Sequence, residues 1–369
     1  MGVKEEKVAR RVIKTPLTPD PGPRTLTRVK VLIVRLSSIG DVIQGIPALV
    51  ALKETFPGWA ISWLVEEASA PLLENHPCLT RLFVLKRRSG GVSNFLRTLA
   101  EIRAEQFDAA IDLQGLLKSA VWVAMSGAGR RIGHKAAREG AHWFLNEYVG
   151  DRPVFDPNFP LIQRYLEPAC HLGADPGKAR FVLPPVSRSV CDRVDQLLQA
   201  ADRARPVVAL CPRSHWITKD WPLEKWALTA RELQNKAQLV LIGASKDAGA
   251  LDSIARAAPA AINLAGQTSL LDLVEIFRRC RCVAGADTGP VHLANATGVP
   301  RIVMVFGATS FRRSGPWSSD PARCRDHVSI SRQLECQPCF ERMCRFRHMN
   351  CLKEISEKEV LEKILERIG

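Results

Sequence analysis

The chain has 369 residues, 46% of them hydrophobic, and a formal net charge of +14 at neutral pH. This length exceeds one ordinary hydrophobic core and predicts two domains of roughly 150–200 residues each. No apolar run approaches the ~18–20 residues of a membrane span, and no apolar signal segment follows the basic N-terminus, so we expect a cytoplasmic protein. The charge indicates anionic partners. Nucleic acid is disfavoured because no basic patch interleaved with aromatic residues and no zinc-finger or RNA-binding signature is found.

Residues 1–28 are rich in Lys, Arg, Pro and Thr, which predicts a flexible basic tail. From Val29 onward, short apolar runs alternate with longer amphipathic stretches, a pattern typical of an α/β protein with parallel strands. The first series is a strand at 29–36, a helix at 42–55, a strand at 60–66, a helix at 93–105, a strand at 108–113 and a helix at 116–126. After a Pro-rich stretch at 151–160 and a polar region at 174–190, the second series has strands near 206–211, 238–243, 261–264, 281–285 and 301–306.

These two series predict two doubly wound, Rossmann-like domains, at 29–185 and 186–350, followed by a C-terminal helix within 351–369. In such domains ligands bind beyond the carboxyl ends of the strands. The two domains should therefore face each other across a central cleft.

The first predicted strand runs into the turn Ser37-Ser38-Ile39-Gly40-Asp41. Gly40 would let the backbone approach a ligand, and Asp41 is suited to accept a proton from a bound hydroxyl. The alternative is an Asp that only satisfies the first amides of its helix. The turn contains neither the glycine pattern of a dinucleotide site nor a P-loop, which disfavours a dehydrogenase or an ATPase.

In the second domain, the segment 287–292 reads Asp-Thr-Gly-Pro-Val-His between a buried strand and a helix start. A helix start carries about half a positive charge and favours a phosphate, and Thr288, Gly289 and His292 could add donors. This pattern predicts an anion site that includes Asp287. An ordinary helix capped by Asp or Thr is the alternative.

Other turns at the ends of strands in the second domain carry polar groups that suit a nucleoside diphosphate. Lys219 could neutralise a diphosphate as a point charge, or could be a solvated loop lysine. The remaining candidates for the donor site are Arg213, Ser214, Gly243, Ser245 and Asp247, together with Ser38 of the first domain.

The chain resembles glycosyltransferase family nine, the bacterial lipopolysaccharide heptosyltransferases, over nearly all of 29–369. The resemblance is carried by S-S-I-G-D-V-I-Q-G-I-P-A-L at 37–49, D-L-Q-G-L-L-K-S-A at 112–120, A-R-E-G at 137–140, K-D-W-P at 219–222, D-T-G-P-V-H-L-A-N-A-T-G-V-P at 287–300 and F-G-A-T at 306–309. Each motif is weak alone, but their shared order is specific.

The resemblance implies a GT-B fold, with the acceptor on the N-terminal domain and ADP-heptose on the C-terminal domain. It implies inversion at the anomeric carbon without a required metal or cofactor, with Asp41 and Lys219 as catalytic residues. The acceptor would be the lipid A–Kdo inner core, contacted at the inner face of the cytoplasmic membrane by Lys118, Arg130, Arg131 and Arg138. Solubilising surface charge is the alternative role of these four residues. Another nucleotide-sugar enzyme of this fold and a non-catalytic protein that binds anionic glycans are the alternative functions.

Four cysteines near the end of the chain have the spacing C-x2-C-x4-C-x6-C, within an insert at 336–351. Cys336, Cys339, Cys344 and Cys351 predict a structural tie of this loop, and a zinc ion or an iron–sulfur group is one form that the tie could take. Disulfides are disfavoured in a reducing cytoplasm. Cys211, Cys280 and Cys282 are expected to be small buried residues.

Overall fold

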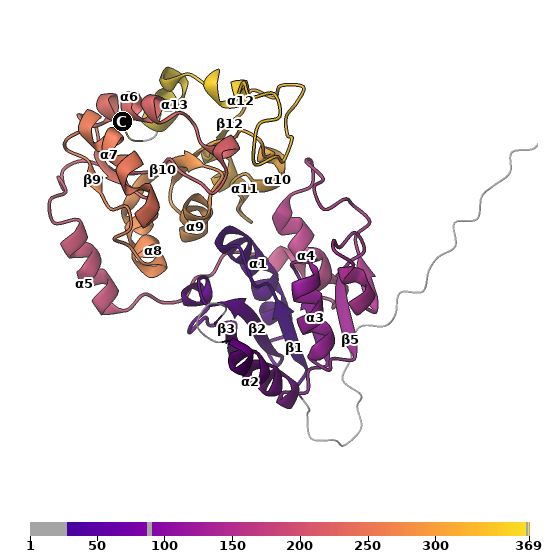
Figure 1. Ribbon diagram of the computed structural model, residues 1–369. Coiled ribbons are helices and arrows are strands. Elements are labelled where there is room, and N and C mark those ends of the chain that lie inside the picture. The colour runs from indigo at the N-terminus through magenta and orange to yellow at the C-terminus, as the bar shows by residue number, and fades with distance from the viewer. Residues whose placement is uncertain (1–27, 87–90, 367, 369) are drawn as a thin grey trace, which may run out of the picture.

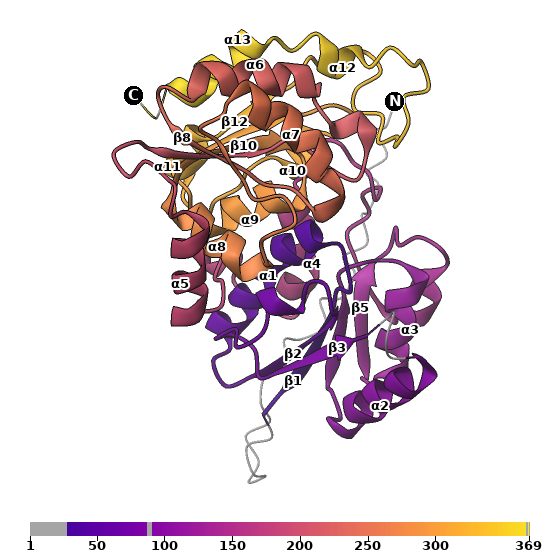
Figure 2. The ribbon, with the colours of Figure 1, turned by 60° about the vertical axis from the view of Figure 1, so that its left-hand side comes forward.

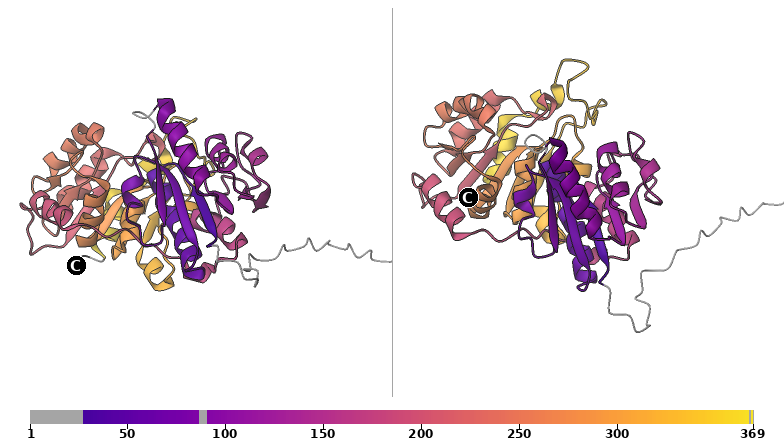
Figure 3. Two further views of the ribbon diagram at one scale, coloured as in Figure 1. Left: turned by 90° about the horizontal axis from the view of Figure 1, so that it is seen from below. Right: turned by 60° about the horizontal axis from the view of Figure 1, so that its bottom comes forward.

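The computed structural model describes residues 28–86, 91–366 and 368. The tail predicted at 1–28 lies outside these residues except for its last position. Two six-stranded parallel sheets occupy separate halves of the molecule (Figure 1, Figure 2 and Figure 3). No helix in the described part of the chain combines the length and the apolar character that crossing a bilayer requires.

The first sheet has the order β3-β2-β1-β4-β5-β6, which is that of a Rossmann fold. Its strands are β1 (Lys30–Val34), β2 (Ala60–Glu66), β3 (Arg81–Leu85), β4 (Ala109–Asp112), β5 (Arg130–His134) and β6 (Glu147–Val149). The helices of this half are α1 (Ile39–Thr55), α2 (Gly91–Ala104), α3 (Leu117–Met125) and α4 (Leu161–His171). β1 pairs with both β2 and β4, so its buried run Val31–Val34 forms the centre of the domain.

The second sheet repeats this order as β12-β11-β10-β7-β8-β9. Its strands are β7 (Val207–Cys211), β8 (Gln238–Leu241), β9 (Ile262–Asn263), β10 (Cys280–Ala286), β11 (Arg301–Val305) and β12 (Val328–Ile330). The helices are α5 (Arg188–Leu197), α6 (Leu223–Leu233), α7 (Ala248–Ala257), α8 (Leu270–Arg279), α9 (Gly289–Thr297), α10 (Phe311–Ser314), α11 (Pro321–Asp326), α12 (Asn350–Lys353) and α13 (Glu357–Leu365). α13 lies where the sequence predicted a C-terminal helix, the short α12 precedes it, and α13 packs on α6 of the second domain (Figure 2).

The two halves meet through α1 and α9, which lie side by side between the sheets (Figure 1, Figure 2). Ile43 on α1 and Leu72 of the first domain are fully buried in a hydrophobic cluster whose other members include Val291 and Leu293 on α9. Each of these helices begins just after the central strand of a sheet. Their first turns therefore meet at the carboxyl edges of both sheets, where the predicted site residues lie.

Candidate active site

A cavity of about 760 Å³ lies between the two domains and is lined by residues from both. This volume suits a ligand of nucleotide-sugar size. Asp41 comes from the first domain, and Lys219, Asp287, Thr288, Gly289 and His292 come from the second. The structure therefore brings together the two groups of residues that the sequence predicted would share a cleft.

Asp41 lies in the first turn of α1 and has four polar contacts. Its Oδ2 accepts hydrogen bonds from the Ser38 hydroxyl (2.7 Å) and the Ser38 backbone N–H (3.3 Å), and it lies 2.6 Å from Nη2 of Arg35. Its Oδ1 accepts a hydrogen bond of 2.8 Å from the Tyr165 hydroxyl. Burial raises the pKa of Asp41, but Arg35, Ser38 and Tyr165 outweigh burial and lower that pKa to about 2. Asp41 is therefore a capping residue as well as an ionised carboxylate that lines the cavity.

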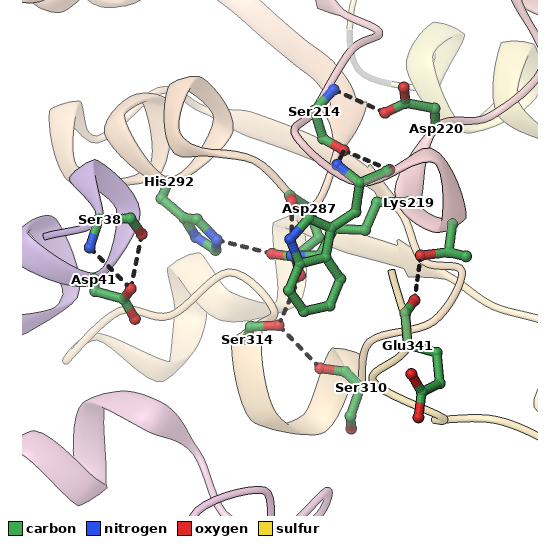
Figure 4. Close-up of polar contacts among 12 residues, drawn as sticks. Ser38, Asp41, Ser214, Lys219, Asp220, Asp287, His292, Ser310, Ser314 and Glu341 are labelled. Carbon is green, nitrogen blue, oxygen red and sulfur yellow. Dashed lines mark hydrogen bonds and ion pairs between the residues drawn. The ribbon is translucent and has the colours of Figure 1, made fainter. Parts of the chain in front are cut away.

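Asp287, at the turn between β10 and α9, is the centre of the second group (Figure 4). Its Oδ2 accepts a 2.9 Å hydrogen bond from Nζ of Lys219, and its Oδ1 accepts one of 2.9 Å from Nε2 of His292. The Ser314 hydroxyl lies 3.3 Å from Oδ2. Burial raises the pKa of Asp287, but Lys219 and His292 outweigh burial and hold it well below its usual range. Asp287 thus positions a lysine and a histidine at the start of α9.

The first turns of α1 and α9 approach each other closely. A Cβ at Gly40 would lie 3.0 Å from Cδ2 of His292 and 3.6 Å from Cα of Gly289. The sequence predicted that Gly40 lets the backbone approach a ligand; in the structure Gly40 lets the opposite domain approach. The N-terminus of α9, with Thr288 as its N-cap residue and Pro290 at its start, points its first amides toward this junction.

Four of the predicted donor-site residues do not line the cavity. Asp247 accepts a 3.0 Å hydrogen bond from the backbone of Ala244, so it caps its own helix start. Arg213 lies 2.9 Å from the carboxylate of Asp220. Gly243 and Ser245 belong to the same turn as Asp247 and lie outside the cavity with it. The two other candidates given with them, Ser214 and Ser38, do line the cavity.

The predicted acceptor residues divide in the same way. Lys118 and Arg138 line the cavity. Arg130 and Arg131 do not, and the prediction for them is corrected: they begin β5, at the end of the strand that lies away from the cleft. Arg130 is paired at 2.7 Å with Glu147, and Arg131 donates to the carbonyl of Phe144.

Several cavity residues were missed from the sequence. Arg35 is a charged residue in the apolar run of the first predicted strand, 29–36, and this anomaly was a usable signal. Tyr165 is one of only two tyrosines in the chain, but nothing in its helical pattern indicated a polar role. Trp216, whose ring centroid lies 4.8 Å from Nζ of Lys219, and Arg313, on the four-residue helix α10, gave no signal because their short segments show no apolar periodicity.

The four clustered cysteines line a second, much smaller cavity of about 20 Å³. All are free thiols, but in the described part of the chain no group of three or more His, Cys, Asp or Glu side chains is arranged to hold a metal ion. Four thiols are ligands that suit zinc or iron, but the four sulfur atoms are not arranged around a common point that could hold the ion. A bound metal therefore stays a prediction, which elemental analysis can check. Hydrogen bonds tie the segment instead: Gln337 donates to the Gly307 carbonyl (2.7 Å), and Thr218 donates to the Glu341 carbonyl (2.6 Å).

Comparison with known proteins agrees with this geometry. A model of glycosyltransferase family 9 (heptosyltransferase) matches residues 95–350. The chain belongs to glycosyltransferase family 9. Its membership confirms the family predicted from the motifs, and the two facing Rossmann-like domains confirm the predicted GT-B fold.

Relatives of this family 9 chain cover nearly its whole length. Lipopolysaccharide heptosyltransferase 1 of Pseudomonas aeruginosa is 27% identical over 346 residues, covering 86% of this chain and 88% of the relative. A family 9 glycosyltransferase of Veillonella parvula superposes with a TM-score of 0.77 at 18% identity, covering 92% and 96% of the two chains. An Escherichia coli heptosyltransferase solved with ADP-2-deoxy-2-fluoro heptose superposes with a TM-score of 0.66 at 22% identity, covering 92% and 99%.

Proposed function

We propose that this protein is an inverting heptosyltransferase that moves heptose from ADP-heptose to a sugar of the lipopolysaccharide inner core. The observation that carries the proposal is that Asp41 and the group around Asp287 line one cavity from opposite domains. Family membership gives the reaction class, and the relatives named above include a lipopolysaccharide heptosyltransferase and a heptosyltransferase solved with an ADP-heptose analogue.

Asp41 acts as the base that receives the proton of the acceptor hydroxyl. A carboxylate with a pKa of about 2 is a weak base, but it is ionised at every physiological pH. The hydroxyl proton becomes strongly acidic as its oxygen bonds to the anomeric carbon, so a weak base suffices. Arg35 and Tyr165 fix the direction of the carboxylate before the acceptor arrives.

The second domain stabilises the leaving diphosphate. Lys219 Nζ and the N-terminus of α9 supply positive charge at the point where negative charge develops as the bond between sugar and diphosphate breaks. Asp287 keeps Lys219 and His292 at this place because it accepts a hydrogen bond from each.

The reaction as proposed requires no divalent metal. Among the described residues, the two carboxylates that line the cavity are both engaged by cations: Asp41 by Arg35, and Asp287 by Lys219. The positive charge needed by the diphosphate is supplied by the chain itself.

Release of ADP tests the proposal directly. ADP should appear from ADP-heptose when a Kdo-bearing lipid A acceptor is added, and Asp41→Ala should abolish this release while it retains binding of the donor. Product formation with another nucleotide sugar and none with ADP-heptose would point to a different donor. Absence of turnover with every donor would point to a binding protein.

Thermal stabilisation by ADP, UDP and GDP would identify the nucleotide, because a ligand that binds the folded protein raises its melting temperature.

We also propose that the protein works at the inner face of the cytoplasmic membrane, in peripheral contact with anionic lipid. The net charge of +14 and an acceptor anchored in lipid support this. Co-sedimentation with vesicles containing phosphatidylglycerol, and none with vesicles of phosphatidylcholine alone, is the expected result. Equal recovery with both vesicles would contradict it.

A further inference from the structure

The cavity holds more positive charge than the proposed donor site uses. Seven Lys and Arg residues line it, against two Asp residues. Three of the cations have carboxylate partners: Arg35 with Asp41, Lys118 with Glu66, and Lys219 with Asp287. The other four, Arg138, Arg164, Arg313 and Arg342, form no ion pair with any carboxylate in the described part of the chain.

Three of these four arginines gather around the segment 152–155. The guanidinium of Arg138 lies 5.3 Å from the ring centroid of Phe155, and that of Arg313 lies 5.9 Å from the same centroid. Nη1 of Arg164, on α4, lies 3.4 Å and 3.3 Å from the carbonyl oxygens of Arg152 and Pro153. The partners of these guanidinium groups are an aromatic ring and two backbone carbonyls at long hydrogen-bond distances. None of these partners carries a negative charge that would neutralise the arginines.

Arg164 and Arg313 are costly to bury without an anion. Arg164 is only 5% exposed, and Nη1 of Arg313 is buried without a hydrogen-bond partner. Burial lowers the pKa of both guanidinium groups, and the charge of Arg313 lowers the pKa of Arg164 further. Arg164 is buried and Arg313 is half-buried. Asp41, Asp156 and Asp287 act on the charge of Arg313 without forming an ion pair with it. An anion bound between the two guanidinium groups would relieve their repulsion.

Arg313 reaches this place from the second domain, because α10 is held against the first. The Ser310 hydroxyl donates a hydrogen bond to the carbonyl of Pro157, and Nη1 of Arg312 donates one of 3.1 Å to Asn158. Arg313 therefore lines the same cavity as Asp41 and lies close enough to Asp41 and Asp287 for both carboxylates to act on its charge.

We propose that Arg164 and Arg313, together with Arg138, form an anion subsite that binds a carboxylate or phosphate group of the acceptor sugar and is complete only when both domains are present. A planar guanidinium binds both groups in a bidentate manner, and two such groups from different elements fix the direction of the sugar as well as its charge. The subsite positions the acceptor hydroxyl toward Asp41. The inference rests on the proposed function, since it names a substrate group at the same site.

The test compares Arg313→Gln with Arg325→Gln in the full-length protein. Arg325, on α11, is exposed, does not line the cavity and takes no part in holding α10, so it is the control for loss of one positive charge. Arg313→Gln should raise KM for a Kdo-bearing lipid A acceptor about tenfold, with kcat and the Kd for ADP-heptose changed less than about twofold. Arg325→Gln should change none of them, and Arg313→Lys should lie between Arg313→Gln and the unaltered protein.

Modified acceptors identify the bound group. Reducing the carboxyl groups of the acceptor to alcohols should raise KM of the unaltered protein and add little to the effect of Arg313→Gln, because both changes remove the same interaction. If the bound group is a phosphate, phosphatase treatment of the acceptor has this effect and carboxyl reduction does not.

Two results would overturn the inference while the proposed function stands. One is a normal acceptor KM in Arg313→Gln. The other is a weaker Kd for ADP-heptose with an unchanged acceptor KM, which would place Arg313 at the diphosphate. If the unaltered protein releases no ADP with any acceptor, the proposed function itself fails. Donor binding and thermal melting of each variant show that it is folded.

Discussion

Nη2 of Arg35 lies 2.6 Å from Oδ2 of Asp41, so the residue that follows β1 holds the carboxylate that opens α1. The same carboxylate accepts a hydrogen bond from the hydroxyl of Tyr165, which lies on α4. The proposed base is thus held by three elements of the first domain before any ligand binds.

Replacing Asp41 with Asn should reduce kcat by about 10²–10⁴, the usual range for loss of a general base. Asn is nearly the same size, and its one carbonyl oxygen can still accept the hydrogen bond from Ser38, while its NH2 group takes the place that faces the Tyr165 hydroxyl. The Kd for ADP-heptose, measured by calorimetry, should change little, because the proposed site of the diphosphate is on the opposite domain. Turnover close to that of the unaltered protein would remove Asp41 from the mechanism.

The low pKa of Asp41 also predicts how stability depends on pH. Folding lowers this pKa from 3.8 to about 2, so the unfolded chain binds the proton more readily. The contribution to stability is fully present above the unfolded pKa and is lost as pH falls through the folded pKa. The shift corresponds to on the order of 2 kcal/mol at pH 7, with roughly half of that remaining near pH 3.

Urea denaturation of Asp41→Asn and the unaltered protein at both pH values measures this contribution. The difference in the free energy of unfolding between the two proteins should be smaller at pH 3 than at pH 7. A difference that is constant, or larger in acid, would show that folding does not lower the pKa of this carboxylate.

Asp287→Asn should weaken ADP-heptose binding by about tenfold or more. The carboxylate is buried and accepts hydrogen bonds from Lys219 and His292, so its loss leaves Lys219 without its buried partner and frees its position. Removing one partner of a buried ion pair commonly costs about 3–5 kcal/mol, so the melting temperature should fall as well. Asp252→Asn, at an exposed carboxylate on α7, is the control for a change of charge alone. Donor affinity equal to that of the control would contradict the positioning role.

The fold and the site could be predicted from the sequence where buried strands run into turns, and not where strands carry charge or segments are short. The central strands β1, β7 and β10 are buried on both faces and read as apolar runs, so their ends and the turns at Asp41 and Asp287 could be placed. β5 and β6 were missed because their sequences, Arg-Arg-Ile-Gly-His and Glu-Tyr-Val, carry charge and lack a continuous apolar run.

The cavity residues outside those turns could not be predicted for a different reason. Arg313 and Trp216 reach the cavity only because tertiary contacts bring their short segments there, and local periodicity carries no information about such contacts. The turn at Gly243 followed the same local pattern as the turn at Gly289, yet it lies outside the cavity, because β8 is displaced toward the edge of the sheet while β10 is central. Sequence pattern identified the type of turn, and strand order decided which turns face the cleft.

The contact between Gly40 and His292 gives a test of whether the two helix starts must meet closely. Gly40→Ala would add a Cβ 3.0 Å from Cδ2 of His292, a distance at which the neighbouring ring has to shift by a few tenths of an ångström. Since His292 is hydrogen-bonded to Asp287, the shift would be transmitted to the residues proposed to bind the diphosphate. We expect kcat/KM to fall about tenfold, in line with the sensitivity of catalysis to small misplacements.

Gly249→Ala is the matched control for this substitution. Gly249 lies in α7, and a Cβ added there would have no other atom within 4 Å. Alanine at this position should therefore leave kcat/KM unchanged and stabilise the helix by about 0.5–1 kcal/mol. If Gly40→Ala also left kcat/KM unchanged, the first turns of α1 and α9 would have room to separate during turnover. The close approach of the two domains would then be a feature of packing, with no part in placing Asp41 opposite the diphosphate.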